Sequence, residues 1–192
     1  MNNHCFDADY SLDEPVIRSM LRRIHVRGHE IGFHPSYNTY KDKEQFCREA
    51  WNLRRVLEEE GIQQDCLGGR QHYLRWETPT TARCWEAAGL DYDSTLSFAD
   101  HAGFRCGVCY EYSLYDLYKR KMLNVRERPL IVMEATLANK KYMGLGYGQA
   151  FIAEALSLKN TTLLFNGAYT FLWHNTSFFP GTTNTIYLQC IR

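Results

Sequence analysis

The 192-residue sequence lacks any apolar run of about 18 residues, so it predicts no transmembrane helix. It also lacks an excess of charge of either sign. Its 22 basic and 22 acidic side chains balance, which gives no reason to expect nucleic acid or an anionic membrane surface as a partner. The first residues contain neither the basic nor the apolar segment of a secretion signal, so we expect a cytoplasmic protein.

A cysteine spacing that would build a disulfide framework is absent as well. The seven cysteines are an odd number, and a chain of this length can fold without cross-links, so we expect reduced thiols. Cys106 and Cys109 form a lone Cys-x-x-Cys pair, which can be redox-active or hold half of a zinc site. No second pair accompanies it, and it lies in an expected loop, so incidental thiols are the favoured interpretation.

The sequence does contain a regular alternation of helical and extended patterns. Capping boxes at residues 11–14 and 42–45 and glycines at positions 28, 61 and 89 mark the helix ends. We expect helices at residues 15–27, 43–60, 79–88, 149–158 and 183–191, and a short one at 115–122. Strands are expected at residues 29–34, 65–70, 90–96, 129–136 and 168–174, and a long loop at 97–112.

This alternation predicts an α/β fold with mostly parallel strands. Residues 129–134 are largely apolar, as in strands that helices cover on both faces. Neither repeats nor linker-like segments divide the chain, so we expect one domain over residues 1–192. Five strands are too few to close a barrel of the usual kind, and no strand is expected before the first helix.

Polar side chains stand where several of these strands end. His34 ends the first strand just before Pro35, Asp93 lies near the end of the third, and His174 ends the last. Side chains at the carboxyl ends of parallel strands face the ligand crevice of such folds. His29 has the opposite strand face to His34, and we interpret it as structural.

These motifs resemble those of the polysaccharide deacetylases, the carbohydrate esterase family with NodB-type homology. The run Gly28-His-Glu-Ile-Gly-Phe-His-Pro-Ser-Tyr-Asn38 is similar to the family's metal-binding motif, Gly-His-Glu-Ile-Gly-Asn-His-x-x-x-His. His34 matches the first metal-binding histidine of that motif, and Asn38 stands in place of the second. The later motifs are matched in order by Arg70 with Tyr73, by the segment 91–96, and by the segment 171–174, Phe-Leu-Trp-His.

The resemblance extends over roughly residues 6–192 and implies a distorted (β/α) barrel. It further implies a metal-dependent hydrolase that removes N-acetyl groups from amino sugars of a polysaccharide. A divalent metal, expected to be zinc, would be bound at His34 and Asn38. The implied catalytic residues are Arg70 and Asp93, which would position their partners, and His174, which would protonate the leaving amine. The implied groove residues are Tyr73, Trp76 and His101.

The family normally has one or two strands before the metal-binding motif, with an Asp-Asp or His-Asp-x-Asp motif on the first. Residues 6–9, Phe-Asp-Ala-Asp, sit where the family has loop, so we expect a member that lacks its first strand or strands. An exposed parallel edge would then remain, and a homodimer is one way to cover it.

Two alternatives to a working enzyme stay open. An Asn carbonyl is a weak, neutral ligand, so the chain could be a non-catalytic carbohydrate-binding relative with a degenerate metal site. A redox protein that uses Cys106 and Cys109 is the third hypothesis.

Overall fold

The computed structural model describes residues 4–179, 181 and 183–192, which fall into two compact units. Unit 1 comprises Met1–Thr95 and Tyr112–Glu127, and unit 2 comprises Leu96–Glu111 and Arg128–Arg192. The chain therefore leaves unit 1 once, returns to it for a β-hairpin and leaves it again. This division does not test whether the chain folds cooperatively, and the expectation of one domain stays a prediction.

Helix α1 (Pro15–Val26) begins where the sequence predicts. Only part of the expected capping box forms: the Ser11 N–H donates to Oε1 of Glu14 at 2.8 Å, but the Ser11 hydroxyl accepts from the N–H of Asp13. Pro15 occupies the first turn, where its missing N–H has no intrahelical partner to lose. Gly28 ends the segment in the left-handed region, at a φ of 77°, as predicted.

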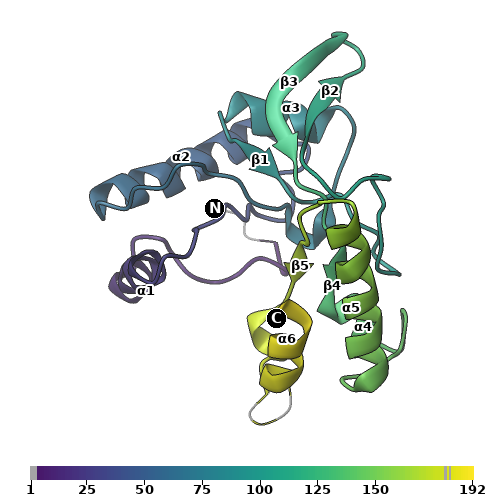
Figure 1. Cartoon of the computed structure of the whole chain (residues 1–192). Helices are drawn as coiled ribbons and strands as arrows, with labels where there is room; N and C mark the ends of the chain where they lie inside the picture. The colour runs from purple at the N-terminus through teal and green to yellow at the C-terminus, as the bar shows by residue number, and fades with distance from the viewer. Residues whose placement is uncertain (1–3, 180, 182) are drawn as a thin grey trace. The chain divides into compact units, whose positions relative to one another are not determined.

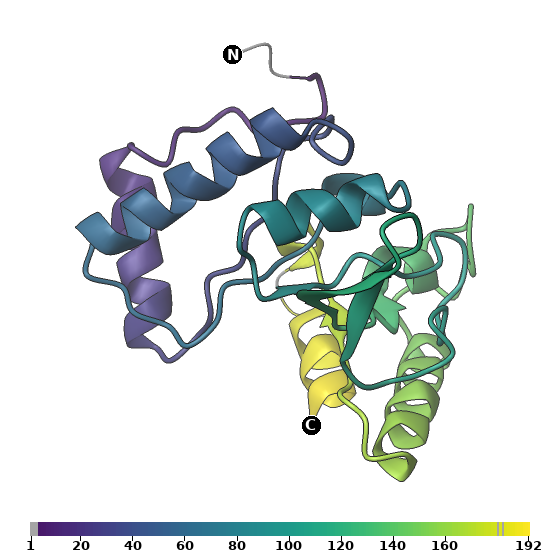
Figure 2. The ribbon, with the colours of Figure 1, turned by 90° about the horizontal axis from the view of Figure 1, so that it is seen from above.

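Helix α2 (Lys43–Glu59) is capped by the Asp42 carboxylate, which accepts the N–H of Gln45 at 3.0 Å. Phe46, Ala50, Leu53 and Leu57 form an apolar stripe along this helix, and all four are buried. Figure 2 shows α1 beside α2, and ion pairs from Arg18 to Glu59 and Glu60 join the two helices.

Helix α3 (Thr80–Ala87) supplies the centre of the unit 1 core. The fully buried Trp85 packs edge-to-face on Phe46 and Phe33, with ring centroids 5.3 and 6.0 Å away. Phe33 directly precedes His34, so this aromatic cluster holds the backbone from which the predicted metal ligand projects.

Three extended segments of unit 1 run parallel in one register. Phe33 bridges to Gly69, Gly69 bridges to Asp93, and strand β1 (Tyr92–Asp93) pairs with strand β3 (Lys121–Glu127), which brings Asp93 opposite Glu127. The predicted parallel arrangement of the segments near residues 33, 69 and 93 is confirmed. The predicted strand lengths are wrong, because pairing at 29–34 and 65–70 is limited to single bridges.

A glycine is required in the middle of this row. A Cβ on Gly69 would lie 2.6 Å from the carbonyl carbon of Phe33 and closer still to its oxygen. The two segments can therefore approach only where one of them has no side chain.

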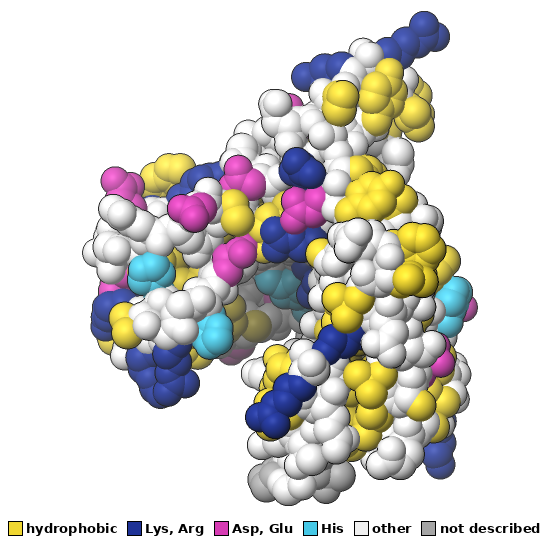
Figure 3. Space-filling model, in the orientation of Figure 1, with side chains coloured by type: hydrophobic (Ala, Val, Ile, Leu, Met, Phe, Trp, Pro, Cys, Tyr) yellow, Lys and Arg dark blue, Asp and Glu magenta, His cyan; other side chains and the backbone are white. Residues whose placement is uncertain are grey.

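The short helix predicted at residues 115–122 is wrong. Strands β2 (Tyr112–Asp116) and β3 form an antiparallel hairpin, and Figure 1 shows β3 between β1 and β2. Along β3 buried and exposed residues alternate, with Leu123, Val125 and Glu127 inward. This two-residue repeat of burial is that of a strand and not of a helix. Figure 3 shows apolar side chains gathered on this hairpin; its exposed members are Tyr115, Leu117, Tyr118 and Met122.

Unit 2 has a smaller sheet, in which β4 (Val132–Met133) pairs in parallel with β5 (Phe171–Leu172). Leu130, Ile131 and Val132 are buried as expected, but helix α4 (Glu134–Ala138) begins where the predicted strand should continue. Helix α5 (Gln149–Leu164) runs further than predicted, and α6 (Thr183–Ile191) has the predicted bounds. Figure 1 shows α5 and α6 as the long helices of this unit.

The architecture is thus mixed α/β with small, largely parallel sheets, which confirms the predicted class. The described residues form no closed barrel, and the distorted barrel stays a proposal. No helix in the described part of the chain has both the length and the apolarity needed to cross a membrane.

Candidate functional site

His34 and Arg70 leave the parallel row of unit 1 at the same end. His34 directly follows Phe33, Arg70 directly follows Gly69, and the Arg70 N–H donates to the Phe33 carbonyl at 2.9 Å. In return, Nδ1 of His34 lies 2.7 Å from the carbonyl oxygen of Arg70. A carbonyl can only accept, so His34 carries its hydrogen on Nδ1, and in the neutral ring Nε2 then bears the lone pair.

His72 faces His34 and was missed in the sequence. Its Nδ1 lies 3.0 Å from Nε2 of His34, and the two rings are nearly perpendicular, at 88°. The other nitrogen of His72, Nε2, lies 2.8 Å from the carbonyl oxygen of Phe6 and must donate to it. His72 opens the 3-10 turn η1 (His72–Leu74), in which Tyr73 and Leu74 have φ of 57° and 52°. Two consecutive non-glycine residues with positive φ are costly, and such backbone strain gathers at functional sites.

The segment before α1 also belongs to this region. Besides the Phe6 carbonyl, it contributes Asp7, whose Oδ1 accepts the N–H of Tyr37 at 2.7 Å and whose Oδ2 accepts the N–H of His4 at 2.9 Å. Asp7 thus holds the loop that follows His34. Sequence reasoning placed residues 6–9 in a loop and assigned them no role, because no periodic pattern indicates where an irregular segment lies.

Asn38, the predicted second metal ligand, is turned toward a cation. Its side-chain oxygen accepts from Nη1 of Arg75 at 3.1 Å, and the same Nη1 donates to the carbonyl of Tyr37 at 2.8 Å. The Arg75 guanidinium lies 3.9 Å from the ring centres of both Tyr37 and Tyr40, which fixes it in place. A positive group so close disfavours a metal ion at the Asn38 oxygen.

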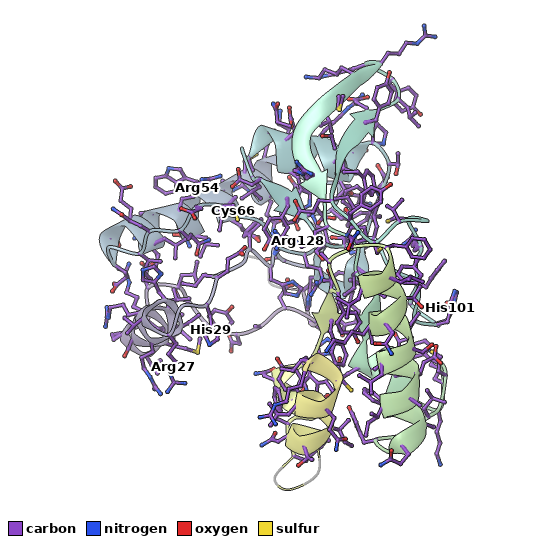
Figure 4. All side chains as sticks on the ribbon, in the orientation of Figure 1. Arg27, His29, Arg54, Cys66, His101 and Arg128 are labelled. Carbon is purple, nitrogen blue, oxygen red and sulfur yellow. The ribbon has the colours of Figure 1, made fainter. Side chains whose placement is uncertain are left out.

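The predicted groove residues lie in different surroundings. Tyr73 is 60% exposed, and its ring packs on Phe6 and Tyr37, with centroids 5.0 and 5.5 Å away. Trp76 packs against the unit 1 core and donates from Nε1 to the Thr78 hydroxyl. His101 belongs to unit 2, where it stacks on Phe98 and hydrogen-bonds Asp100 at an exposed position (Figure 4). The structure does not bring these three together within one unit.

Arg70 and Asp93 form the buried support of the row. Arg70 donates from Nε to the Ser94 carbonyl at 2.6 Å and from Nη2 to the Ser94 hydroxyl at 3.0 Å. Burial lowers the pKa of Arg70, while the charge of Asp93 acts in the opposite direction. Asp93 accepts both the N–H and the hydroxyl of Thr95. Burial raises the pKa of Asp93 to about 6, although hydrogen bonds from Glu127 and Thr95 and the Arg70 charge oppose the rise.

His174 follows β5 in unit 2, where its carboxylate partner is Glu134 and not Asp93. Nδ1 of His174 lies 2.7 Å from Oε1 of Glu134, and the Ser177 hydroxyl donates to the same oxygen at 2.9 Å. Glu134 is fully buried, while the side chain of His174 is 49% exposed. Burial would raise the pKa of Glu134, but the hydrogen bonds and the charge of His174 outweigh it and lower this pKa. The predicted role of Asp93 in orienting an imidazole stays a prediction.

This pair has the geometry of an acid–base group. A buried carboxylate on Nδ1 fixes the tautomer and orientation of the imidazole, and Nε2 becomes the nitrogen that exchanges protons. Glu134 was missed because the predicted strand ran past it, to residue 136. A signal was available, since Glu134 directly follows the apolar segment 130–133, just as His34 follows Phe33.

The remaining sequence candidates take no part in the hydrogen bonds described above. His29 is exposed just beyond α1, near Arg27 (Figure 4). Within unit 2 the Cys106 thiol donates to the Leu96 carbonyl and the Cys109 thiol to the Thr162 carbonyl, each at 3.9 Å. The two sulfurs thus have different hydrogen-bond partners, and the redox hypothesis gains no support from them.

A divalent metal fits the donors around His34 only in part. No group of three or more His, Cys, Asp or Glu side chains suited to a metal occurs among residues 4–179, 181 and 183–192. Two imidazoles, His34 and His72, do face each other with their donor nitrogens, and neutral imidazole is a common ligand of zinc and similar ions. Two protein ligands leave positions for water and substrate.

Comparisons with known proteins add nothing to this description. No family model matches the chain, and neither curated proteins nor solved structures match it.

Proposed function

We propose that this chain is a metal-dependent hydrolase that removes N-acetyl groups from the amino sugars of a polysaccharide. The observation that supports this most is the parallel row of unit 1. Residues 33, 69 and 93 stand in register, so His34 of the metal-binding motif and Arg70 of the arginine motif leave the row side by side at its carboxyl end. Ligand sites of parallel α/β folds lie at that end.

A bound divalent ion would polarise the acetyl carbonyl and lower the pKa of a water molecule beside it. His34 and His72 would hold the ion. The side chain of Arg70 hydrogen-bonds Ser94. Its proposed role is to fix the turn in which the backbone carbonyl of Arg70 accepts from Nδ1 of His34. In the neutral ring that hydrogen bond places the lone pair on Nε2 of His34, and it fixes the orientation of the ring.

His174 would act on the leaving group. Amide hydrolysis breaks the bond between the acetyl carbon and the sugar nitrogen, and that nitrogen must gain a proton as it leaves. An imidazolium held through Nδ1 by Glu134 can deliver this proton from Nε2. Ser177 shares the same carboxylate oxygen and helps to keep it in place.

The rival function, a carbohydrate-binding protein without activity, has one observation in its favour. Phe6 and Tyr73 are 47% and 60% exposed with their rings 5.0 Å apart, and exposed rings of this kind can stack on sugars. On that interpretation the metal and the acid–base pair would be dispensable. In either case we propose a polysaccharide or oligosaccharide as the partner and a cytoplasmic location.

The test measures acetate released from N-acetylglucosamine oligomers by purified protein, first stripped of metal and then supplied with Zn²⁺ or Co²⁺. We expect acetate release only with metal. We expect a loss of roughly 10²- to 10⁴-fold in kcat for His174→Ala, because general acid catalysis contributes on that order. His29→Ala is the matched control, because His29 is exposed and has no part in the proposed mechanism, and it should keep full activity.

Binding of the oligomers without acetate release at any metal loading would refute the hydrolase and favour the carbohydrate-binding protein. Acetate release that His174→Ala leaves unchanged would keep a hydrolase but would refute the role given to His174.

A further inference from the structure

We infer that His72 is the second imidazole ligand of the divalent cation that His34 binds. The sequence motif places Asn38 in that role. The inference rests on the proposed function only for the kind of ion. Its evidence is the arrangement of the two rings and of the backbone around them, all within unit 1.

The first step concerns the hydrogens of the two rings. Nδ1 of His34 must donate to the carbonyl of Arg70, and Nε2 of His72 must donate to the carbonyl of Phe6. Each neutral ring has one hydrogen on nitrogen, so each has spent it on a backbone carbonyl. The two nitrogens that face each other at 3.0 Å, Nε2 of His34 and Nδ1 of His72, both bear lone pairs. Two facing lone pairs repel unless a positive charge lies beside both.

The second step concerns distance. Imidazole nitrogens bind zinc at about 2.0–2.1 Å, so two of them on one ion, at angles between octahedral and tetrahedral, stand about 2.9–3.4 Å apart. The 3.0 Å separation of the two ring nitrogens falls in this range. The rings stand nearly perpendicular, at 88°, so the two imidazoles are not stacked on each other.

The third step concerns support around the rings. Metal-binding histidines commonly donate their other N–H to a backbone carbonyl or a carboxylate, which fixes the tautomer. Both rings here donate a hydrogen bond of this kind, His34 to the carbonyl of Arg70 and His72 to the carbonyl of Phe6. The strained residues Tyr73 and Leu74 follow His72 directly, so the chain accepts an unfavourable turn where it presents this ring.

Asn38 is the poorer candidate on each count. Its side-chain oxygen is an uncharged metal ligand, and it already accepts a hydrogen bond from Arg75. The rings of Tyr37 and Tyr40 hold the guanidinium of Arg75 in place. A divalent ion bound there would lie close to that positive charge. His72 therefore supplies from the arginine motif the imidazole that the metal-binding motif lacks at position 38.

The experiment measures binding of Zn²⁺ and Co²⁺ to metal-free protein by isothermal titration calorimetry, with no substrate and no activity readout. Wild type is compared with His34→Ala, His72→Ala and Asn38→Ala, and circular dichroism checks that each variant is folded. We expect one ion per wild-type chain and at least a tenfold loss of affinity for both histidine variants, because even outer residues of metal sites cost 10- to 100-fold. Asn38→Ala should bind within about threefold of wild type.

A second variant guards against misfolding of the alanine mutant. His72→Cys replaces the imidazole with another zinc ligand and should recover much of the Zn²⁺ affinity that His72→Ala loses. The inference is overturned if His72→Ala binds metal as wild type does, if Asn38→Ala alone abolishes binding, or if wild type binds no ion, which would leave a shared proton between the rings. Metal binding that depends on His72 without acetate release would refute the proposed hydrolase and leave this inference standing.

Discussion

Gly69→Ala should damage the fold and the candidate metal centre together, because Gly69 is the middle member of the parallel row. Its backbone conformation lies outside the left-handed region, so the cost is steric. The new Cβ would stand 2.6 Å from the carbonyl carbon and 2.7 Å from the nitrogen of Phe33. Ordinary contacts of this kind need about 3.4 Å or more, so the Phe33 backbone must retreat by roughly 0.8 Å or more.

That movement breaks hydrogen bonds whose number gives the magnitude. The row is held here by Phe33 N–H to Gly68 O at 2.7 Å, by Arg70 N–H to Phe33 O at 2.9 Å, and by Gly69 N–H to Tyr92 O at 3.2 Å. At about 1 kcal/mol each, losing two or three of them lowers the free energy of unfolding by about 2–3 kcal/mol. With an m-value near 2 kcal/mol/M in urea, the midpoint falls by about 1–1.5 M.

Gly32→Ala is the matched control for this measurement. A Cβ at Gly32 would meet its nearest atoms at 3.5 and 3.7 Å, which is ordinary contact, and its backbone is also outside the left-handed region. We expect a change within about 0.5 kcal/mol. The reasoning is refuted if urea unfolding gives the two variants the same midpoint with unchanged m-values. It is also refuted if Gly69→Ala binds Zn²⁺ as tightly as wild type does, since His34 and Arg70 flank the displaced residues.

Three further predictions use other parts of the molecule. Glu134→Gln removes the charge that stabilises the imidazolium of His174. We expect kcat to fall roughly 10-fold or more and the alkaline limb of its pH profile to move to lower pH. An unchanged pH profile would mean that Glu134 has a purely structural role. Burial raises the pKa of Asp93, which is hydrogen-bonded to Glu127, so the folded state holds a proton on this pair of carboxyl groups that the unfolded state has lost. Stability should therefore fall as the pH rises from about 4 to about 6. Asp93→Asn should flatten that fall in a series of thermal melts, and an equally steep fall in the variant would contradict the assignment. The strand β2 is an edge of its sheet, and its hairpin exposes apolar side chains, so we expect a homodimer in sedimentation velocity; a monomer at all concentrations would exclude it.

Much of the secondary structure followed from local signals, and the failures have local causes. Capping residues and glycines placed α1, α2 and α3 well, because these signals act within one helical turn. The segment 115–122 was misassigned because the alternation along β3 continues beyond it, to Glu127, and was not followed that far. The segments 29–34 and 65–70 are extended and parallel but pair through single bridges, since the contact at Gly69 depends on a backbone approach that no hydrophobic pattern encodes.

The candidate site shows the same boundary between what is local and what is not. Glu134 could have been found, because a carboxylate that directly follows a buried apolar strand satisfies the rule that singled out His34 and His174. His72 could not have been found in this way, because its role depends on two backbone carbonyls. The carbonyl of Arg70 is far from His34 in the sequence, and the carbonyl of Phe6 lies before α1. Those carbonyls decide which ring nitrogen keeps its hydrogen, and the two nitrogens left with lone pairs meet only in the folded chain. An asparagine at position 38 therefore argues against a metal site only if both imidazole ligands must come from the segment 28–38. The second imidazole proposed here, His72, comes from a different segment.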